Sequence, residues 1–180
     1  MNPIPTYNLM LNTLEEGCPG ISEAWGKFLC EASTLCFESQ SHPRGIELKV
    51  HGSSNCSFKV HWENDIPDQA RNAWDDKQEL TEYGACGVAV LLILRLTDFT
   101  VIRRARKGTG VDYWLAHKNT DKLFQDAARL EVSGIMNGDA NAIKARVNRK
   151  RKQTQLSDGV LPAFIVVVEF SKPESHLVQK

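Results

Sequence analysis

The fold is predicted first from the stretches GTGVDYWL (residues 108–115) and RLEVSG (residues 129–134). Successive side chains of a strand point to opposite faces, so Val111 and Tyr113 face one way while Asp112 faces the other. By the same rule Glu131 and Ser133 project together, away from their apolar neighbours. Neighbouring strands lie about 4.8 Å apart, so pairing of the two stretches brings the two carboxylates together. Carboxylate oxygens suit Mg²⁺, whose remaining positions water and substrate phosphate fill.

The surrounding sequence predicts an α/β order of elements. A helix is predicted over residues 68–97, and from Gly84 onward it is almost wholly apolar, so this half must be buried, its small residues allowing close packing on a sheet. Three strands (99–106, 111–117 and 128–135), a basic helix (141–155) and an unbroken apolar strand (163–170) follow. A strand without alternation usually lies inside a sheet covered on both faces. We therefore expect a mixed central sheet flanked by helices over residues 68–180.

Residues 1–67 predict an N-terminal extension packed on this core. A helix is expected from Ser22, and the polar stretch 39–45 is expected to be a loop. Residues 46–51 and 58–62 alternate between apolar and polar side chains, and a turn sequence that begins at Gly52 separates them. The extension is therefore expected to be a helix and a β-hairpin.

Length and composition favour a globular protein. The chain has 180 residues, of which 42% are hydrophobic and 24% charged, and this composition excludes disorder over its whole length. The longest apolar run, residues 84–94, is much shorter than the roughly 20 residues that a membrane span needs. The first residues do not resemble a signal peptide, and the five cysteines include no CxxC pair, so we expect a cytoplasmic protein with reduced thiols and no structural zinc.

The net charge of zero hides an asymmetry between the two halves. Residues 1–90 carry 13 acidic and 6 basic side chains, whereas residues 91–180 carry 9 acidic and 16 basic ones. The basic residues cluster before Asp112 and on the helix after Glu131. They are Arg103, Arg104, Arg106 and Lys107 in the first cluster, and Lys144, Arg146, Arg149, Lys150, Arg151 and Lys152 in the second. Such clusters can hold a nucleic-acid backbone without reading its sequence, although a basic helix is often only a solvated face.

The spacing of GTGVDYWL and RLEVSG, preceded by a helix bearing Thr81-Glu82 and followed by a basic helix and an apolar strand, resembles the PD-(D/E)XK nuclease superfamily. The resemblance covers about residues 77–170 and implies a restriction-endonuclease-like fold. It implies that Asp112 and Glu131 bind Mg²⁺ or Mn²⁺, with Glu82, or else Glu79, as a third acidic ligand. Ser133 stands where the family pattern has lysine.

The resemblance also implies that another cation replaces this lysine in the catalytic site. Some members of the family supply it from the following helix, where Lys144 is the nearest candidate. Lys107, just before the GTG turn, is another candidate. The implied activity is metal-dependent cleavage of nucleic acid, DNA rather than RNA, within a bacterial defence or DNA-processing system. Many relatives work as homodimers, and a bare domain of this size suggests that a partner protein supplies targeting.

Two other functions remain open from the sequence. The chain could be a catalytically silent subunit that uses its basic helix to bind nucleic acid or a partner protein, because Ser133 carries no positive charge. It could also be a structural or immunity-type protein whose basic residues bind nothing. These hypotheses differ in whether Asp112 is needed for turnover and whether binding needs a metal.

Overall fold

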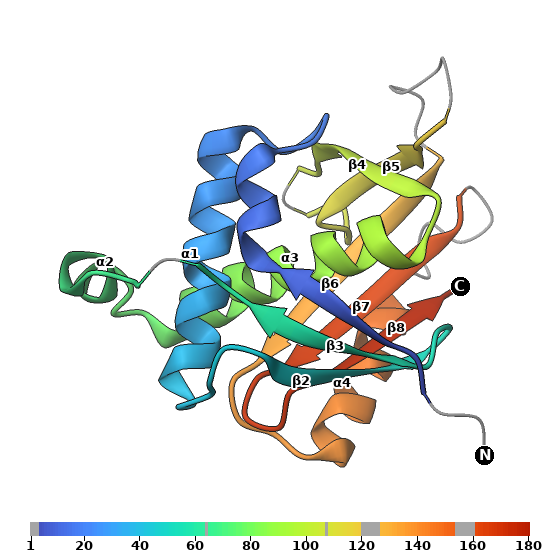
Figure 1. Cartoon of the computed structure of the whole chain (residues 1–180). Coiled ribbons are helices and arrows are strands. Elements are labelled where there is room, and N and C mark those ends of the chain that lie inside the picture. Colours follow the sequence, from blue (N-terminus) through green and yellow to red (C-terminus); the bar gives the residue numbers. More distant parts are fainter. Residues whose placement is uncertain (1–3, 64, 107, 120–126, 154–160) are drawn as a thin grey trace.

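An eight-stranded mixed sheet forms the centre of the protein (Figure 1). The computed structural model describes residues 4–63, 65–106, 108–119, 127–153 and 161–180. The strands, in the sheet order β1-β3-β2-β8-β7-β6-β5-β4, are β1 (Thr6–Met10), β3 (Cys56–His61), β2 (Ile46–Gly52), β8 (Glu174–Gln179), β7 (Ala163–Glu169), β6 (Ala128–Ile135), β5 (Tyr113–His117) and β4 (Phe99–Arg104). The helices are the 3₁₀ helix η1 (Leu11–Glu16), α1 (Glu23–Ser39), α2 (Asp68–Ala73), α3 (Lys77–Leu96) and α4 (Ala140–Gln153). The expected α/β class, a mixed sheet flanked by helices, is confirmed.

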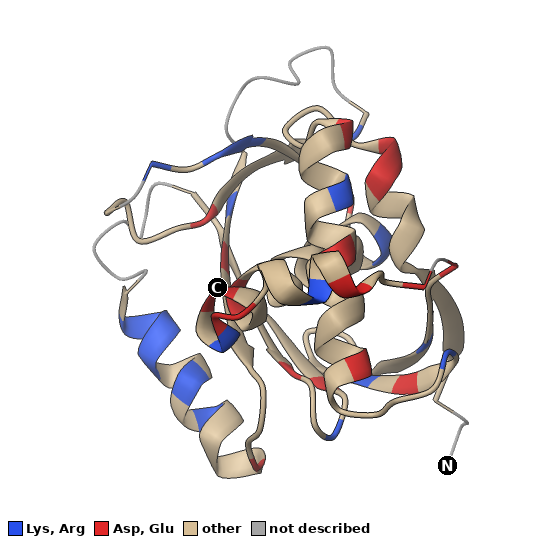
Figure 2. Cartoon of the chain, turned by 90° about the vertical axis from the view of Figure 1, so that its left-hand side faces the viewer, with Lys and Arg blue, Asp and Glu red and all other residues tan. Residues whose placement is uncertain are grey.

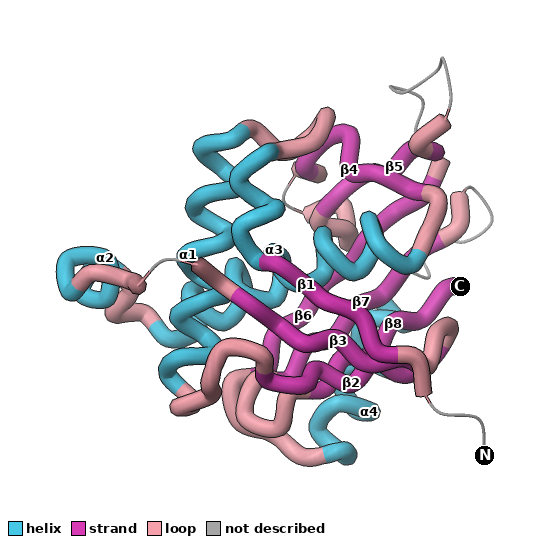
Figure 3. Tube along the Cα trace, in the orientation of Figure 1, coloured by secondary structure: helices cyan, strands magenta, loops and turns pink. Residues whose placement is uncertain are grey.

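Helices cover both faces of the central strands, as Figure 3 shows. Alternate residues of β7 separate between two apolar clusters: Val166 packs with α1 and α3, and Val167 packs with α4. All seven residues of β7 are buried. The unbroken apolar strand of the sequence therefore lies inside the sheet with both faces covered, as predicted.

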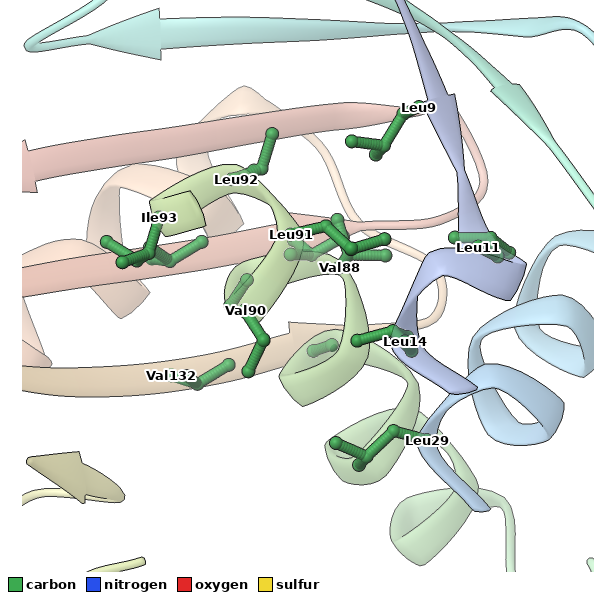
Figure 4. Packing of buried hydrophobic residues seen from close by; sticks show 14 of the residues in the cluster. Leu9, Leu11, Leu14, Leu29, Val88, Val90, Leu91, Leu92, Ile93 and Val132 are labelled. Carbon is green, nitrogen blue, oxygen red and sulfur yellow. The ribbon is translucent and has the colours of Figure 1, made fainter. Parts of the chain in front are cut away.

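The apolar half of α3 packs against the sheet on one side and against α1 on the other (Figure 4). Two glycines permit the approach of α1, because a Cβ at Gly84 would lie 2.4 Å from Cys36 Sγ and one at Gly87 would lie 2.2 Å from Ser33 Oγ. These small residues thus serve packing between two helices, whereas the sequence predicted packing on the sheet. The close contact between α3 and the sheet depends instead on Gly134 of β6, where a Cβ would lie 2.3 Å from the Thr81 carbonyl oxygen.

The helix predicted over residues 68–97 is two helices. The short α2 ends at Ala73, and α3 begins at Lys77 because the Asp76 side chain accepts hydrogen bonds from the N–H groups of Gln78 and Glu79, at 2.8 and 3.1 Å. A capping aspartate of this kind is a sequence feature of helix starts, which the continuous polar composition of this region concealed.

Three elements were not predicted, and one of them, β8, connects the extension to the core. Strand β8 pairs antiparallel with β7 and parallel with β2, so the N-terminal hairpin continues the same sheet. Strand β1 adds to this side by pairing parallel with β3, and η1 follows it. The turn before β8 is held by the buried Glu169 carboxylate, which accepts hydrogen bonds from the N–H groups of Ser171 and Lys172, at 3.0 and 2.7 Å.

The described helices include none that is both long enough and apolar enough to cross a membrane. The 20-residue α3 is long enough, but it begins with charged and polar residues. Its apolar part packs against α1 and the sheet.

We predict that Gly134→Ala destabilises the fold. A Cβ at Gly134 would lie 2.3 Å from the backbone carbonyl oxygen of Thr81, and backbone atoms cannot rotate away as a side chain can. The expected loss is about 1–3 kcal/mol in the free energy of unfolding, measured by urea denaturation. Ala145→Ser, on the exposed side of α4, is the control and is expected to change stability by less than about 0.5 kcal/mol. Equal stability of Gly134→Ala and the wild type would contradict the proposed tight contact.

Candidate active site

Asp112 lies immediately before β5 and is fastened to β6 at two points. Its backbone N–H donates to the Leu130 carbonyl oxygen at 2.9 Å, and its Oδ2 accepts a hydrogen bond from the Val132 N–H at 2.7 Å. Tyr113 pairs with Leu130 in the sheet register, so the next position along β6, Glu131, lies beside Asp112. The two carboxyl groups lie close enough for each to shift the pKa of the other. The structure thus brings together the two carboxylates that the strand periodicity placed side by side.

Burial and mutual repulsion make this pair hold a proton more tightly than ordinary carboxylates do. Burial, followed by the negative charge of Asp112, raises the pKa of Glu131 to about 7. Burial also raises the pKa of Asp112, against the opposing effects of the Val132 N–H and the Lys150 charge. Near neutral pH the pair is therefore a site where a proton or a metal cation relieves the repulsion between the half-buried Asp112 and the buried Glu131.

Helix α4 supplies positive charge to the same place. The Lys150 ammonium forms an ion pair with Glu131, and Arg146 Nη1 donates a hydrogen bond to Ser133 Oγ at 3.0 Å. Both cations lie next to the helix face that Ile143 and Val147 bury against the sheet. The serine in the lysine position of the family pattern is therefore accompanied by two cations from the following helix.

A cavity of about 790 Å³ opens beside the carboxylates. Strand β6 extends past the start of β5, so residues 132–135 have no strand partner on that side, and this edge forms one wall. The cavity is lined by Lys77, Gln78, Thr81, Glu82, Tyr83 and Cys86 of α3, by Arg104 and Asp112, by residues 132–137, and by Arg146 and Lys150. Four cations thus face a cavity that two carboxylates, those of Asp112 and Glu82, also line.

Two acidic side chains at this site, Asp112 and Glu131, suit a divalent cation, and they do so without a third acidic ligand. Within the residues that the structure describes, no group of three or more His, Cys, Asp and Glu side chains is arranged to hold a metal ion. Glu82 lines the cavity, where its Oε1 accepts a hydrogen bond from Gln78 Nε2 at 3.2 Å, and Glu79 does not line it. Two adjacent carboxylates with a cavity beside them still suit Mg²⁺, which binds proteins through one or two carboxylates and retains several waters.

The other predicted site residues are spread around this cavity and beyond it. Lys144 does not line the cavity, and its charge instead lowers the pKa of His176 on β8, after the larger effects of burial and of His51. Arg103 lies over the Trp114 ring. Arg106, Arg149 and Lys152 are exposed, and Lys107 lies outside the described residues. Figure 2 shows the basic residues of α4 as successive bands along one helix, whereas the acidic bands that lie on helices belong to the other helices.

Lys150 and Arg104 lie at the cavity, whereas sequence reasoning assigned them only to general backbone binding. For Lys150 a sequence feature existed: it follows Ile143 by seven residues and Val147 by three, so helical spacing puts it on the buried face. Arg104 had no such feature. Its guanidinium is placed by Trp25 of α1 and Tyr83 of α3, whose rings lie 4.8 and 5.8 Å away.

We predict that Asp112→Asn stabilises the metal-free protein at high pH. Both carboxyls titrate with ordinary pKa values when unfolded, whereas folding raises the pKa of Glu131 to about 7. Ionisation of the pair therefore costs stability progressively as pH rises from about 4.5 to about 7, and the full cost persists above that. The variant is expected to gain on the order of 1 kcal/mol at pH 8 and nothing at pH 4.

Urea unfolding in EDTA across this pH range measures the effect. Glu82→Gln, which removes an exposed carboxylate at the same cavity, is the matched control and is expected to show little pH-dependent gain. A variant at Asp112 that is less stable than the wild type at pH 8 would show that the pair is already neutralised by its surroundings.

Comparison with protein-family models, with curated proteins and with solved structures found no match to this chain. The functional conclusion therefore depends on the arrangement of the chain's own residues around the cavity.

Proposed function

We propose that the protein hydrolyses phosphodiester bonds in nucleic acid with the help of a divalent metal ion. The observation that carries this proposal is the adjacent pair of carboxylates, the half-buried Asp112 and the buried Glu131, beside a cavity lined by arginine and lysine. A phosphodiester is an anion, so a hydrolytic site for it needs both carboxylates for the metal and cations for the phosphate. Asp112 and four cations line the cavity, and Glu131 lies beside Asp112.

The order of elements supports the proposed kinship with PD-(D/E)XK nucleases. Helix α3 is followed by three antiparallel neighbours, β4, β5 and β6, and then by α4 and β7, which pairs parallel with β6. Asp112 precedes the second of these strands and Glu131 lies on the third, in the order on which the resemblance depends. We therefore propose a restriction-endonuclease-like core of α3, β4–β6, α4 and β7.

In the proposed reaction each residue has a defined task. Asp112 and Glu131 would hold Mg²⁺ or Mn²⁺, which when bound polarises the phosphate and makes a coordinated water a better nucleophile. Arg104 and Arg146 line the cavity and would hold the phosphate oxygens, since a guanidinium can donate two parallel hydrogen bonds to them. Lys150 would stabilise negative charge that develops on the reacting phosphate, the task for which Lys144 was the nearest candidate in the sequence.

The biological setting proposed for this activity is DNA cleavage in bacterial defence or DNA processing. A partner protein that supplies targeting, or a second copy of the chain that cuts the opposite strand, would fit this setting. The charge distribution supports the binding of nucleic acid, because the basic residues of α4 can contact its backbone irrespective of its sequence.

We predict that cleavage of plasmid or single-stranded DNA requires Mg²⁺ or Mn²⁺, is abolished by EDTA, and falls at least about 100-fold in Asp112→Ala and Glu131→Ala.

The cleavage rate of Lys150→Ala is expected to fall about tenfold or more, and that of Lys144→Ala much less, because of these two lysines Lys150 reaches the carboxylates. Lys172→Ala, an exposed residue outside the cavity, controls for the loss of a positive charge. RNA of the same sequence, assayed in parallel, tests the proposed preference for DNA. Metal-dependent cleavage that survives both carboxylate substitutions would rule out this site.

A second function is favoured by the ion pair between Lys150 and Glu131. An ammonium on Glu131 occupies the carboxylate that a metal would use, as expected if the site has become a structural ion pair in a catalytically silent subunit. Such a subunit would bind nucleic acid in EDTA as well as in Mg²⁺, with strong dependence on salt. Under this alternative the wild type cleaves no nucleic acid, and Asp112→Ala does not change binding. The comparison with the preceding prediction therefore decides between the two.

A further inference from the structure

Lys150 lies between the two groups that the proposed reaction has to bring together. Its ammonium forms an ion pair with Glu131, one of the two proposed metal ligands. The same side chain lines the cavity of about 790 Å³, where the substrate phosphate would lie. The Lys150 side chain is 18% exposed and that of Glu131 is 6% exposed, so water shields this pair only weakly. The lysine is therefore bound to one carboxylate of the site, and the cavity is open beside it.

A divalent cation and this ammonium would compete for Glu131. Mg²⁺ binds carboxylate oxygens directly, at about 2.1 Å. A metal ion in that position would repel an ammonium on the same carboxylate, because two positive charges a few ångströms apart attract no compensating water in a shielded site. Metal binding to Glu131 would therefore require the Lys150 ammonium to leave.

The ammonium can leave Glu131 without movement of its helix. Ile143 and Val147 bury α4 against the sheet, and Lys150 follows Val147 by three residues. A lysine carries its charge on a flexible four-carbon stem, so rotation about side-chain bonds is enough to move it. In the cavity it would approach Arg146, which lies about one turn earlier on α4 and is held there by a hydrogen bond to β6. The displaced ammonium would thus join a guanidinium that is already placed for an anion.

We propose that Lys150 exchanges partners during binding: its ammonium leaves Glu131 when a divalent cation binds there, and it then binds the substrate phosphate. Metal binding consequently favours nucleic-acid binding, and by linkage nucleic acid favours metal binding to the same degree. This inference rests on the proposed function and adds an order to it, because the phosphate meets the full set of cations only after the metal is in place. It also gives the ion pair a task in an active enzyme.

Labelling of lysine amines by acetic anhydride, read for each lysine by mass spectrometry, follows the exchange in the wild-type chain. Lys150 is expected to react slowly in EDTA, several times faster in saturating Ca²⁺, and slowly again when a DNA single strand of about 12 nucleotides is added to the Ca²⁺ complex. Ca²⁺ replaces Mg²⁺ because its longer bonds to oxygen polarise water less, and a gel checks that the strand stays intact. Lys144 and Lys172, both exposed and outside the cavity, should react equally in EDTA and in Ca²⁺.

Lys150→Gln tests the competition for Glu131 directly. The glutamine amide can still donate a hydrogen bond to Glu131, but it carries no charge. Mn²⁺, whose binding is measured by electron paramagnetic resonance, is therefore expected to bind this variant about tenfold more tightly than the wild type. Lys144→Gln is the matched control, because it removes the same charge from an exposed position of α4 that does not line the cavity. Its Mn²⁺ affinity is expected to stay within about twofold of the wild type.

Equal labelling of Lys150 in EDTA and in Ca²⁺, or Mn²⁺ binding that is not tighter in Lys150→Gln, would overturn the exchange. Labelling that stays fast after the strand is added would overturn its second step. Metal-dependent cleavage together with equal labelling would remove the exchange and leave the proposed function standing. The expected labelling pattern in a chain that cleaves no nucleic acid would support the exchange and remove the hydrolysis. If the wild type binds no Mn²⁺, both proposals fall together.

Discussion

The burial of the apolar half of α3 is the constraint on which the rest of the structure depends. This half packs against the sheet and α1, so it needs a partner on two sides. The core strands provide one side, and only the N-terminal residues can provide the other, through Gly84 and Gly87 against α1. The extension is consequently part of the core in a physical sense. The same packing fixes the polar first turns of α3, with Glu82 and Tyr83, at the edge of the cavity.

The fold holds two carboxylates of like charge, Asp112 and Glu131, next to each other at the site. Two carboxylates are held beside each other by a backbone clamp on Asp112 and by the register of β5 and β6, although burial disfavours the ionised state of each. Helix α4 relieves part of this conflict through Lys150. An arrangement that costs stability in the absence of a ligand is typical of groups placed for binding or chemistry, and pKa values displaced by burial and a charged partner are common in such sites.

Helix α4 and strand β4 approach this pair from different directions and give the cavity its positive charge. The cations of α4 follow from helical spacing beside Ile143 and Val147. The cation of β4 that lines the cavity, Arg104, depends on contacts with Trp25 and Tyr83, which come from α1 and α3. The basic second half of the sequence is therefore divided in space between two walls around the acidic pair.

The sequence by itself determined the local features: the alternation that faces Asp112 and Glu131 away from their apolar neighbours, the buried β7, the basic α4 and the α/β order. These follow from period and composition, which each segment carries within itself. Only the tertiary structure decided that the N-terminal hairpin joins the core sheet through β8, that α1 covers α3, and that Lys150 rather than Lys144 reaches Glu131. It also decided that Arg104 belongs to the cavity. These outcomes depend on which distant segments touch, and the free energy of such contacts comes from shape and burial that no single segment encodes.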